Sequence, residues 1–236
     1  MPETPRARPH LYPALLELEN RDVLLVGGGE VAFRKAMGLF GSACRLTVVA
    51  SELLPSFKAW LDEKRILYEE RPYRNGEAAG YFLVLSATDD AEVNRRIAED
   101  AQGAGRLINV ADQPALSSFF VPSVVKRDAL QVAISTDGKC PALALKIRLE
   151  LEEVLSDRYG PLLERLATMR DRLRAAFPAS GEQRKRILER ILSSAAVERF
   201  LSGDASRLDR MLSGWEKSRV RSRRPDGGQA SSPAAL

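Results

Sequence analysis

Cysteine and histidine are nearly absent from this chain of 236 residues. Cys44 and Cys140 are its only cysteines, and His10 is its only histidine. Two cysteines are too few for a disulfide framework or a zinc site, and one histidine leaves no basis for a histidine-rich metal site. We therefore expect no metal held by the protein, and any chemistry must rely on carboxylates, hydroxyls, amides or a borrowed cofactor.

Long hydrophobic runs are also absent. No segment approaches the roughly 18 uninterrupted apolar residues of a membrane span. The first residues, MPETPRARPHLYP, lack the apolar core of a secretion signal. These absences predict a cytoplasmic protein without a membrane partner.

The net charge of +4 is confined to one end of the chain. After Glu216 the basic residues are Lys217, Arg219, Arg221, Arg223 and Arg224, against the single acid Asp226. The remaining body is formally neutral, so we expect no nucleic-acid partner. The segment 219–236 is also rich in Pro, Gly and Ser, which predicts a disordered basic tail; contact of this tail with RNA or a membrane is the alternative.

Short β-rich runs alternate with helical patterns over the first half of the chain. The expected strands are 22–27, 45–50, 65–70, 81–87 and 106–111. The expected helices between them are 30–42, 52–64 and 90–105. A repeating strand–helix order predicts a doubly wound, mainly parallel sheet.

The pattern changes after this region. Segments 117–127 and 129–135 read as two further strands joined around Asp128, and the chain from Pro141 to about Ser218 has helical patterning throughout. We expect four parts: 1–113 as a nucleotide-binding domain, 114–140 as a β segment, 141–218 as a helical domain and 219–236 as the tail.

Three successive glycines end the first expected strand. Gly27 to Ala32 reads GGGEVA, which fits G-x-G-x-x-A between a strand and a helix. In that context Gly27 permits the tight turn and Gly29 lets the backbone approach a pyrophosphate at the positive end of the helix. The motif predicts a Rossmann-type dinucleotide site; a glycine-rich turn without a ligand is the alternative.

The end of the second strand indicates which dinucleotide is bound. Ser51 and Glu52 come directly after the strand, and the next basic residue is Lys58. An acid at this place binds the ribose hydroxyls of NAD, whereas an arginine marks NADP. The sequence favours NAD, although Glu52 could instead serve only to start the next helix.

Polar residues also come after the fourth and fifth expected strands. Thr88 and Asp89 are placed either to contact the cofactor or to cap the next helix. Asn109 and Asp112 lie in and just after an otherwise apolar strand, where an amide and a carboxylate could orient a substrate and move a proton. For Asp112 the alternative is turn formation before Pro114.

Four segments together resemble one enzyme family. They are LLVGGGEVAFRKA, SATDD, INVADQPALSSFFVPSVVKR and LQVAISTDGKCPALALKIRLELE. In this order they are similar to the NAD-dependent precorrin-2 dehydrogenases of sirohaem biosynthesis, including the amino-terminal half of multifunctional sirohaem synthases. The resemblance extends over about residues 12–155.

The resemblance implies a fold, an activity and site residues. It implies a Rossmann-type domain, a dimerising β segment and a C-terminal helical domain, with oxidation of precorrin-2 to sirohydrochlorin in a homodimer paired through residues 118–135. Glu30, Val31, Ser51 and Glu52 match the NAD contacts of the family. Asp112 matches a carboxylate regarded as essential, and Asn109 accompanies it.

The substrate implied by this resemblance is a tetrapyrrole with many carboxylates. Basic residues could pair with those carboxylates. The candidates are Lys126, Arg127, Lys139, Lys146 and Arg148. The family often has a phosphorylatable serine where this chain has Thr136, so the resemblance gives no basis for that regulation here.

Two other activities remain open from the sequence. One is a bifunctional enzyme that also inserts ferrous iron into sirohydrochlorin. The other is a regulatory module that binds NAD or NADH without turnover, in which Asp112 has no chemical role.

Overall fold

The computed structural model describes residues 11–212 and divides into two compact units. Unit 1 extends to Val121, and unit 2 begins at Pro122. The expected tail, 219–236, lies outside the described residues. Each unit has its own sheet and its own helices.

Unit 1 contains the parallel sheet that the sequence predicts. Its strands are β1 (Asp22–Val26), β2 (Arg45–Ala50), β3 (Leu67–Glu70), β4 (Leu83–Ser86) and β5 (Leu107–Val110). The strand order is β3-β2-β1-β4-β5, and all four pairings are parallel. Chain order reverses beside β1, which is where open sheets of this class bind ligands.

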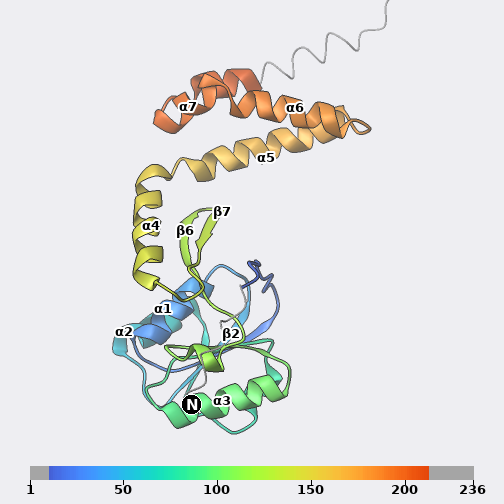
Figure 1. Ribbon diagram of the computed structural model, residues 1–236. Coiled ribbons are helices and arrows are strands. Elements are labelled where there is room, and N and C mark those ends of the chain that lie inside the picture. Colours follow the sequence, from blue (N-terminus) through green and yellow to red (C-terminus); the bar gives the residue numbers. More distant parts are fainter. Residues whose placement is uncertain (1–10, 213–236) are drawn as a thin grey trace, which may run out of the picture. The chain divides into compact units, whose positions relative to one another are not determined.

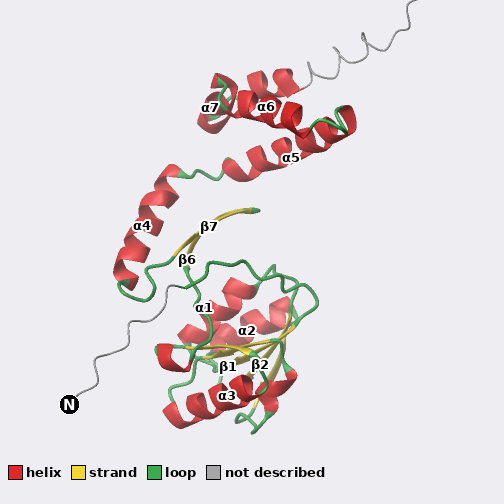
Figure 2. Ribbon diagram, turned by 45° about the vertical axis from the view of Figure 1, so that its right-hand side comes forward, coloured by secondary structure: helices red, strands yellow, loops and turns green. Residues whose placement is uncertain are grey.

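Helices cover both faces of this sheet (Figure 2). They are α1 (Glu30–Leu39), α2 (Pro55–Lys64) and α3 (Ala91–Gly103), with short 3₁₀ turns η1 (Glu77–Gly80) and η2 (Pro114–Leu116). Strand β1 is buried on both sides because Val23 packs with α1 and α2 whereas Leu24 packs with α3. A near-continuous apolar strand is therefore expected here.

Unit 2 combines a hairpin with helices (Figure 1). Strands β6 (Ser123–Arg127) and β7 (Leu130–Ile134) pair antiparallel. The helices are α4 (Pro141–Val154), α5 (Tyr159–Ala176), α6 (Gly181–Leu192) and α7 (Ala195–Ser202). A separate core joins α5, α6 and α7 around Leu173 and Phe200. The change from parallel sheet to hairpin and helices confirms the predicted fold class.

The hairpin turn of unit 2 packs against the beginning of α5. Asp128 has a left-handed backbone with φ 52°, and Gly160 is buried opposite its carboxylate. A Cβ atom at Gly160 would lie 1.9 Å from Asp128 Oδ2. Gly160 therefore allows the turn to approach the helix closely.

No helix among residues 11–212 is long and apolar enough to cross a membrane.

Candidate functional site

The glycine turn after β1 is shaped by its neighbours at two positions. Gly27 has φ 132°, and a Cβ atom there would lie 2.2 Å from the carbonyl oxygen of Ala87. At Gly28 a Cβ atom would lie 1.8 Å from the carbonyl oxygen of Glu52. Both positions therefore require glycine, because backbone carbonyls of other segments lie too close to leave room for a side chain.

Gly29 differs from these two glycines. No protein atom lies within 4 Å of the place where its Cβ atom would be, and its φ of −88° is open to any residue. Gly29 is the N-cap of α1, and no side chain caps this helix. The first amide groups of a helix have no carbonyl partner within it, and its dipole attracts anions. The space beside Gly29 therefore fits a phosphate group.

A cavity of about 1090 Å³ opens in front of this turn at the carboxyl ends of the strands. All predicted site residues except Asn109 line it: Gly27, Gly29, Glu30, Val31, Ser51, Glu52, Thr88, Asp89 and Asp112. The volume is slightly above the usual range of about 300–1,000 Å³ for small-molecule sites, and it suits an extended ligand such as a dinucleotide.

The loop after β2 is fixed against the glycine turn. Leu54 donates a backbone hydrogen bond of 3.0 Å to the carbonyl of Gly28. Ser51 and Glu52 are exposed at the cavity wall. Helix α2 begins at Pro55 and has no acidic residue in its first turn. Glu52 is therefore not part of the helix start, and its carboxylate is available to a ligand.

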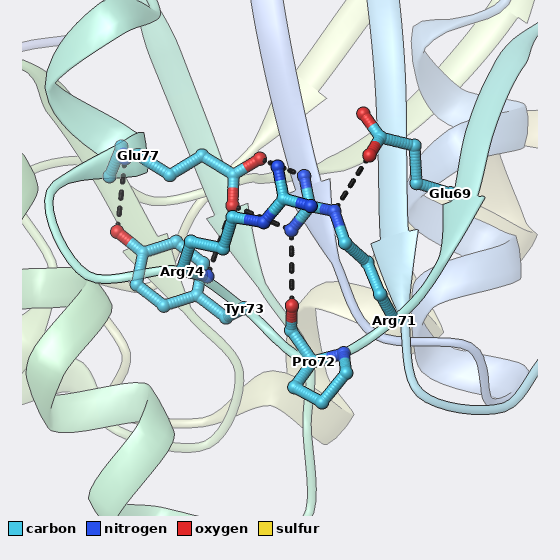
Figure 3. Close-up of polar contacts among 7 residues, drawn as sticks. Glu69, Arg71, Pro72, Tyr73, Arg74 and Glu77 are labelled. Atoms are coloured by element: carbon cyan, nitrogen blue, oxygen red, sulfur yellow. Dashed lines mark hydrogen bonds and ion pairs between the residues drawn. The ribbon is translucent and has the colours of Figure 1, made fainter.

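Arg71 is a cavity residue that the sequence did not predict (Figure 3). Its guanidinium pairs with Glu77 at 2.5 Å and with Glu69 at 2.6 Å, and it donates to the carbonyl of Pro72 at 3.0 Å. The carboxylate of Glu77 raises the pKa of Arg71, with a smaller contribution from Glu69. Two carboxylates thus neutralise this cation, which enters the cavity wall from the segment after β3.

The loop after β4 is held by a buried amide. The hydroxyls of Ser86 and Thr88 donate to Asn94 Oδ1 at 2.5 and 3.0 Å, and Asn94 Nδ2 donates to the Thr88 carbonyl at 2.8 Å. Asp90 caps α3 by accepting hydrogen bonds from two backbone amides. Asp89 is exposed at the cavity, so the capping role belongs to Asp90, and Asp89 remains available to a ligand.

Asn109 is nearly buried, with 7% exposure, and both ends of its amide are occupied. Lys35 Nζ donates to Asn109 Oδ1 at 2.7 Å, and Asn109 Nδ2 donates to the Phe119 carbonyl at 3.0 Å. Asn109 is thus a buried residue of β5 that does not line the cavity. Lys35, on α1, was also not predicted from sequence because its partner is 74 residues away.

Asp112 lies in a turn directly after β5 and lines the cavity. Its backbone is left-handed, with φ 56°, and the residue is exposed. This conformation is uncommon for residues other than glycine, although aspartate tolerates it. The turn holds a carboxylate at the cavity edge, where it can accept a proton from a ligand.

Three of the five proposed substrate cations are paired with acidic residues within unit 2. Arg127 donates to the carbonyls of Leu155 and Glu152 and pairs with Asp157 at 3.1 Å. Arg148 pairs with the side chain of Glu152. Lys126 and Lys139 are exposed, and Lys146 lies 3.7 Å from Glu150. Arg127 therefore acts as a structural link, which does not fit the expectation of a free carboxylate-binding cation.

Three family models match the chain in consecutive order. The model described as putative NAD(P)-binding matches residues 14–123, that of the sirohaem biosynthesis protein central region matches 127–153, and that of the sirohaem synthase dimerisation region matches 158–214. Unit 1 is accordingly an NAD(P)-binding domain.

Individual proteins that resemble this chain belong to the same family as the matched models. The chain is 37% identical over 206 residues to a siroheme synthase of Methylobacillus flagellatus, covering 86% of this chain and 44% of that protein. It is 40% identical over 190 residues to siroheme synthase 1 of Aeromonas salmonicida, covering 80% of this chain and 40% of that protein. The chain thus spans less than half the length of these relatives.

A solved structure matches nearly over its whole length. The structure of SirC, a precorrin-2 dehydrogenase, superposes with a TM-score of 0.67 at 26% identity, covering 81% of this chain and 98% of that one. Together with the three consecutive family models, these likenesses show that the chain belongs to the family of precorrin-2 dehydrogenases and the corresponding region of sirohaem synthases.

Proposed function

We propose that this protein oxidises precorrin-2 to sirohydrochlorin with NAD as the hydride acceptor. The observation that carries the proposal is a dinucleotide-sized cavity that has an uncapped helix end at Gly29 and the carboxylate of Asp112 in the same wall. The likeness to a precorrin-2 dehydrogenase over 98% of that protein's chain supports the choice of substrate.

NAD fits the residues better than NADP. The exposed carboxylate of Glu52 can accept hydrogen bonds from ribose hydroxyls, and it would repel a 2′-phosphate. Arg71 lines the cavity, but four of its hydrogen bonds go to Glu69, Glu77 and Pro72. A phosphate would have to compete with two carboxylates for this guanidinium.

The residues of the chain have distinct parts in the reaction. The bound dinucleotide supplies a two-electron acceptor for the hydride. The α1 terminus and the loop of Ser51 and Glu52 hold the dinucleotide in place. Oxidation releases one proton for each hydride transferred, and Asp112 accepts that proton as a general base. Asn109 does not line the cavity, and we give it no part in proton transfer.

Turnover of the purified protein tests this proposal. Freshly made precorrin-2 is mixed with NAD or NADP, and reduced cofactor is followed at about 340 nm, its usual absorption band. We expect turnover with NAD to exceed that with NADP by about 10-fold, which corresponds to one net hydrogen bond of about 1.4 kcal/mol. Equal use of NADP would direct attention to Arg96, which also lines the cavity and donates to the neutral amide of Asn75.

Iron insertion is the second candidate activity. Relatives of this chain are named siroheme synthases, and a carboxylate such as Asp112 can remove pyrrole protons while the macrocycle binds the metal. Incubation of sirohydrochlorin with Fe²⁺, without NAD and without oxygen, tests it. Sirohaem formation above the protein-free rate, lost in Asp112→Asn, would establish a bifunctional enzyme. Binding of NAD with neither activity would instead indicate a sensor.

The proposal includes a homodimer in the cytoplasm. The match to a sirohaem synthase dimerisation region over 158–214 supports the dimer and points to unit 2 as its place. The separate expectation that 114–140 contributes to pairing stays a prediction. Cell fractionation with an antibody against the full chain tests the location.

A further inference from the structure

Arg71 lies at the end of the strand next to the loop that we assign to the ribose of NAD. Strand β3 ends at Glu70 and β2 ends at Ala50, and these two residues are partners in the parallel register. The residues that follow them, Ser51 after β2 and Arg71 after β3, line the same cavity. An arginine near this place is the usual partner of the 2′-phosphate of NADP. Arg71 thus provides a guanidinium on the side of the cavity where such a phosphate would be recognised.

The guanidinium of Arg71 is already occupied by two carboxylates (Figure 3). Its Nη1 and Nη2 groups donate to the two oxygens of Glu77 at 3.0 and 2.5 Å, and its Nε group donates to Glu69 at 2.6 Å. Nη1 also donates to the carbonyl of Pro72. These bonds use four of the five N–H groups of a guanidinium. Arg71 therefore has little donor capacity left for a ligand.

The charges around Arg71 also disfavour a phosphate. Two carboxylates around one guanidinium leave one negative charge in excess. Hydrogen bonds from Arg71 lower the pKa of Glu69 and of Glu77, so both are ionised at neutral pH. Arg71 and Glu77 are mostly buried, where charges are screened less than in water. Arg74, in the same segment, is exposed and is not among the residues that line the cavity.

The second carboxylate is more than the fold requires. Glu77 alone joins the segment after β3 to η1, and one carboxylate is sufficient to neutralise an arginine. The side chain of Glu69 is 43% exposed, and its partner is only two residues away. A partly exposed local pair of this kind adds little to stability. What Glu69 does add is a second acceptor for a guanidinium in the cavity wall.

We propose that Glu69 and Glu77 determine cofactor specificity by occupying Arg71, so that the protein rejects NADP although it has an arginine placed for the 2′-phosphate. This inference rests on the proposed function, which assigns the cavity to a dinucleotide. The two carboxylates act through Arg71 and take no part in hydride or proton transfer.

Cofactor binding by variants tests the release of Arg71. Each full-length protein is titrated with NADP and with NAD by calorimetry, without precorrin-2. Glu69→Gln and Glu77→Gln each remove one of the two carboxylates. We expect either change to tighten NADP binding by about 10-fold, the effect of one charge-assisted hydrogen bond to the phosphate, and to leave the Kd of NAD within about 2-fold of wild type.

Control variants separate the release of Arg71 from a general loss of negative charge. In Glu69→Gln combined with Arg71→Gln the gain in NADP affinity should disappear, because no guanidinium is left to bind the phosphate. Glu69→Gln combined with Arg74→Gln is the matched control, since it removes an exposed neighbouring cation, and it should keep most of the gain. Glu92→Gln removes a carboxylate of α3 that does not line the cavity, and NADP affinity should not change.

Four results would overturn the inference. They are an unchanged NADP affinity in Glu69→Gln, an equal gain for NAD, a gain that persists without Arg71, and wild-type binding of NADP as tight as that of NAD. Glu69→Gln decides the question even if Glu77→Gln does not fold. The titrations need no turnover, so absence of NADH formation by the wild-type protein would refute the proposed function alone, and the titrations would still decide the inference.

Discussion

At the scale of single residues, Gly28 and Gly29 are neighbours with different requirements. A side chain at Gly28 would collide with the Glu52 carbonyl, whereas a side chain at Gly29 would meet no protein atom within 4 Å. The same substitution at both positions therefore separates folding from ligand binding. Serine suits this comparison because it is a favourable N-cap residue at Gly29.

We predict that Gly28→Ser destabilises the protein by about 2 kcal/mol or more, the usual range for forced overpacking. Gly29→Ser should leave the free energy of unfolding unchanged or slightly higher, yet weaken NAD binding by about 10-fold or more, since its side chain enters the phosphate space. Urea unfolding without NAD and calorimetric NAD titration measure the two effects. Undiminished NAD affinity in Gly29→Ser would show that the glycines only turn the chain.

Asp112 allows a test of chemistry without loss of fold. Asparagine tolerates the left-handed backbone of Asp112 at least as well as aspartate does. We predict that Asp112→Asn keeps a near-wild-type Tm and NAD affinity while kcat falls by about 10²-fold or more, the usual contribution of general acid–base catalysis. Asp128→Asn, at another left-handed aspartate in unit 2, is the control and should keep full turnover. Retained turnover in Asp112→Asn would show that Asp112 is not the general base of the reaction.

The sequence could predict site residues that occupy a fixed position in a local motif or directly follow a strand. Gly29 and Glu52 belong to the strand–glycine–helix motif and the next strand end, and Asp112 lies directly after a strand. Lys35 and Arg71 were not predicted, because their importance depends on which distant groups they contact. The partner of Lys35 is 74 residues away in β5. In sequence Lys35 is one more polar residue of a helix.

At the scale of elements, the segment after β3 depends on one ion-pair network. The side chains of Arg71 and Glu77 are 15% and 14% exposed and join the end of β3 to η1. The guanidinium of Arg71 lowers the pKa of Glu77 below its ordinary value of 4.5. The stabilisation by this carboxylate is therefore complete above about pH 5, and it is lost as the pH falls through the folded-state pKa.

We predict that Glu77→Gln lowers the free energy of unfolding by about 1–3 kcal/mol at pH 7, the range for hydrogen bonds to charged groups. The difference from wild type should begin to shrink as the pH falls below 4.5, where the carboxyl of the unfolded state takes up a proton, and it should be lost below the lowered folded-state pKa of Glu77. Urea unfolding at several pH values measures this. Glu92→Gln, which removes an exposed pair with Arg95, should have a much smaller effect. A difference that persists at low pH would contradict an ionic origin.

The elements themselves were largely predictable. Hydrophobic periodicity placed all five parallel strands, with boundaries shifted by two residues or fewer. It also predicted the hairpin, but β6 begins at Ser123 and not at Ser117. The hydroxyls of Ser117 and Ser118 instead accept hydrogen bonds from backbone amides of β5. Periodicity could not reveal this return of the chain to β5, because side-chain hydrogen bonds to a neighbouring strand determine it.

At the scale of the whole molecule, we assign NAD binding to unit 1 and dimer formation to unit 2. The cavity lies wholly within unit 1. Both units have large apolar side chains that are exposed, and in unit 2 three of them are leucines of α4. On α4, Leu145 is 47% and Leu149 is 49% exposed, and only Ala144 is buried. Leu145 and Leu149 are four residues apart and so share one side of the helix. These two leucines therefore offer a place to test for the proposed dimer contact.

We predict that Leu145→Glu combined with Leu149→Glu converts the proposed dimer to a monomer of 26.1 kDa, since two carboxylates would have to be buried without partners. NAD affinity should persist because its cavity lies in unit 1. Light scattering with size-exclusion chromatography measures the mass. Leu67→Glu, at a 63% exposed leucine of β3 in unit 1, is the control and should remain dimeric. A double variant that keeps the dimer mass would show that Leu145 and Leu149 do not lie at the contact, and the matched dimerisation region, 158–214, becomes the next segment to substitute.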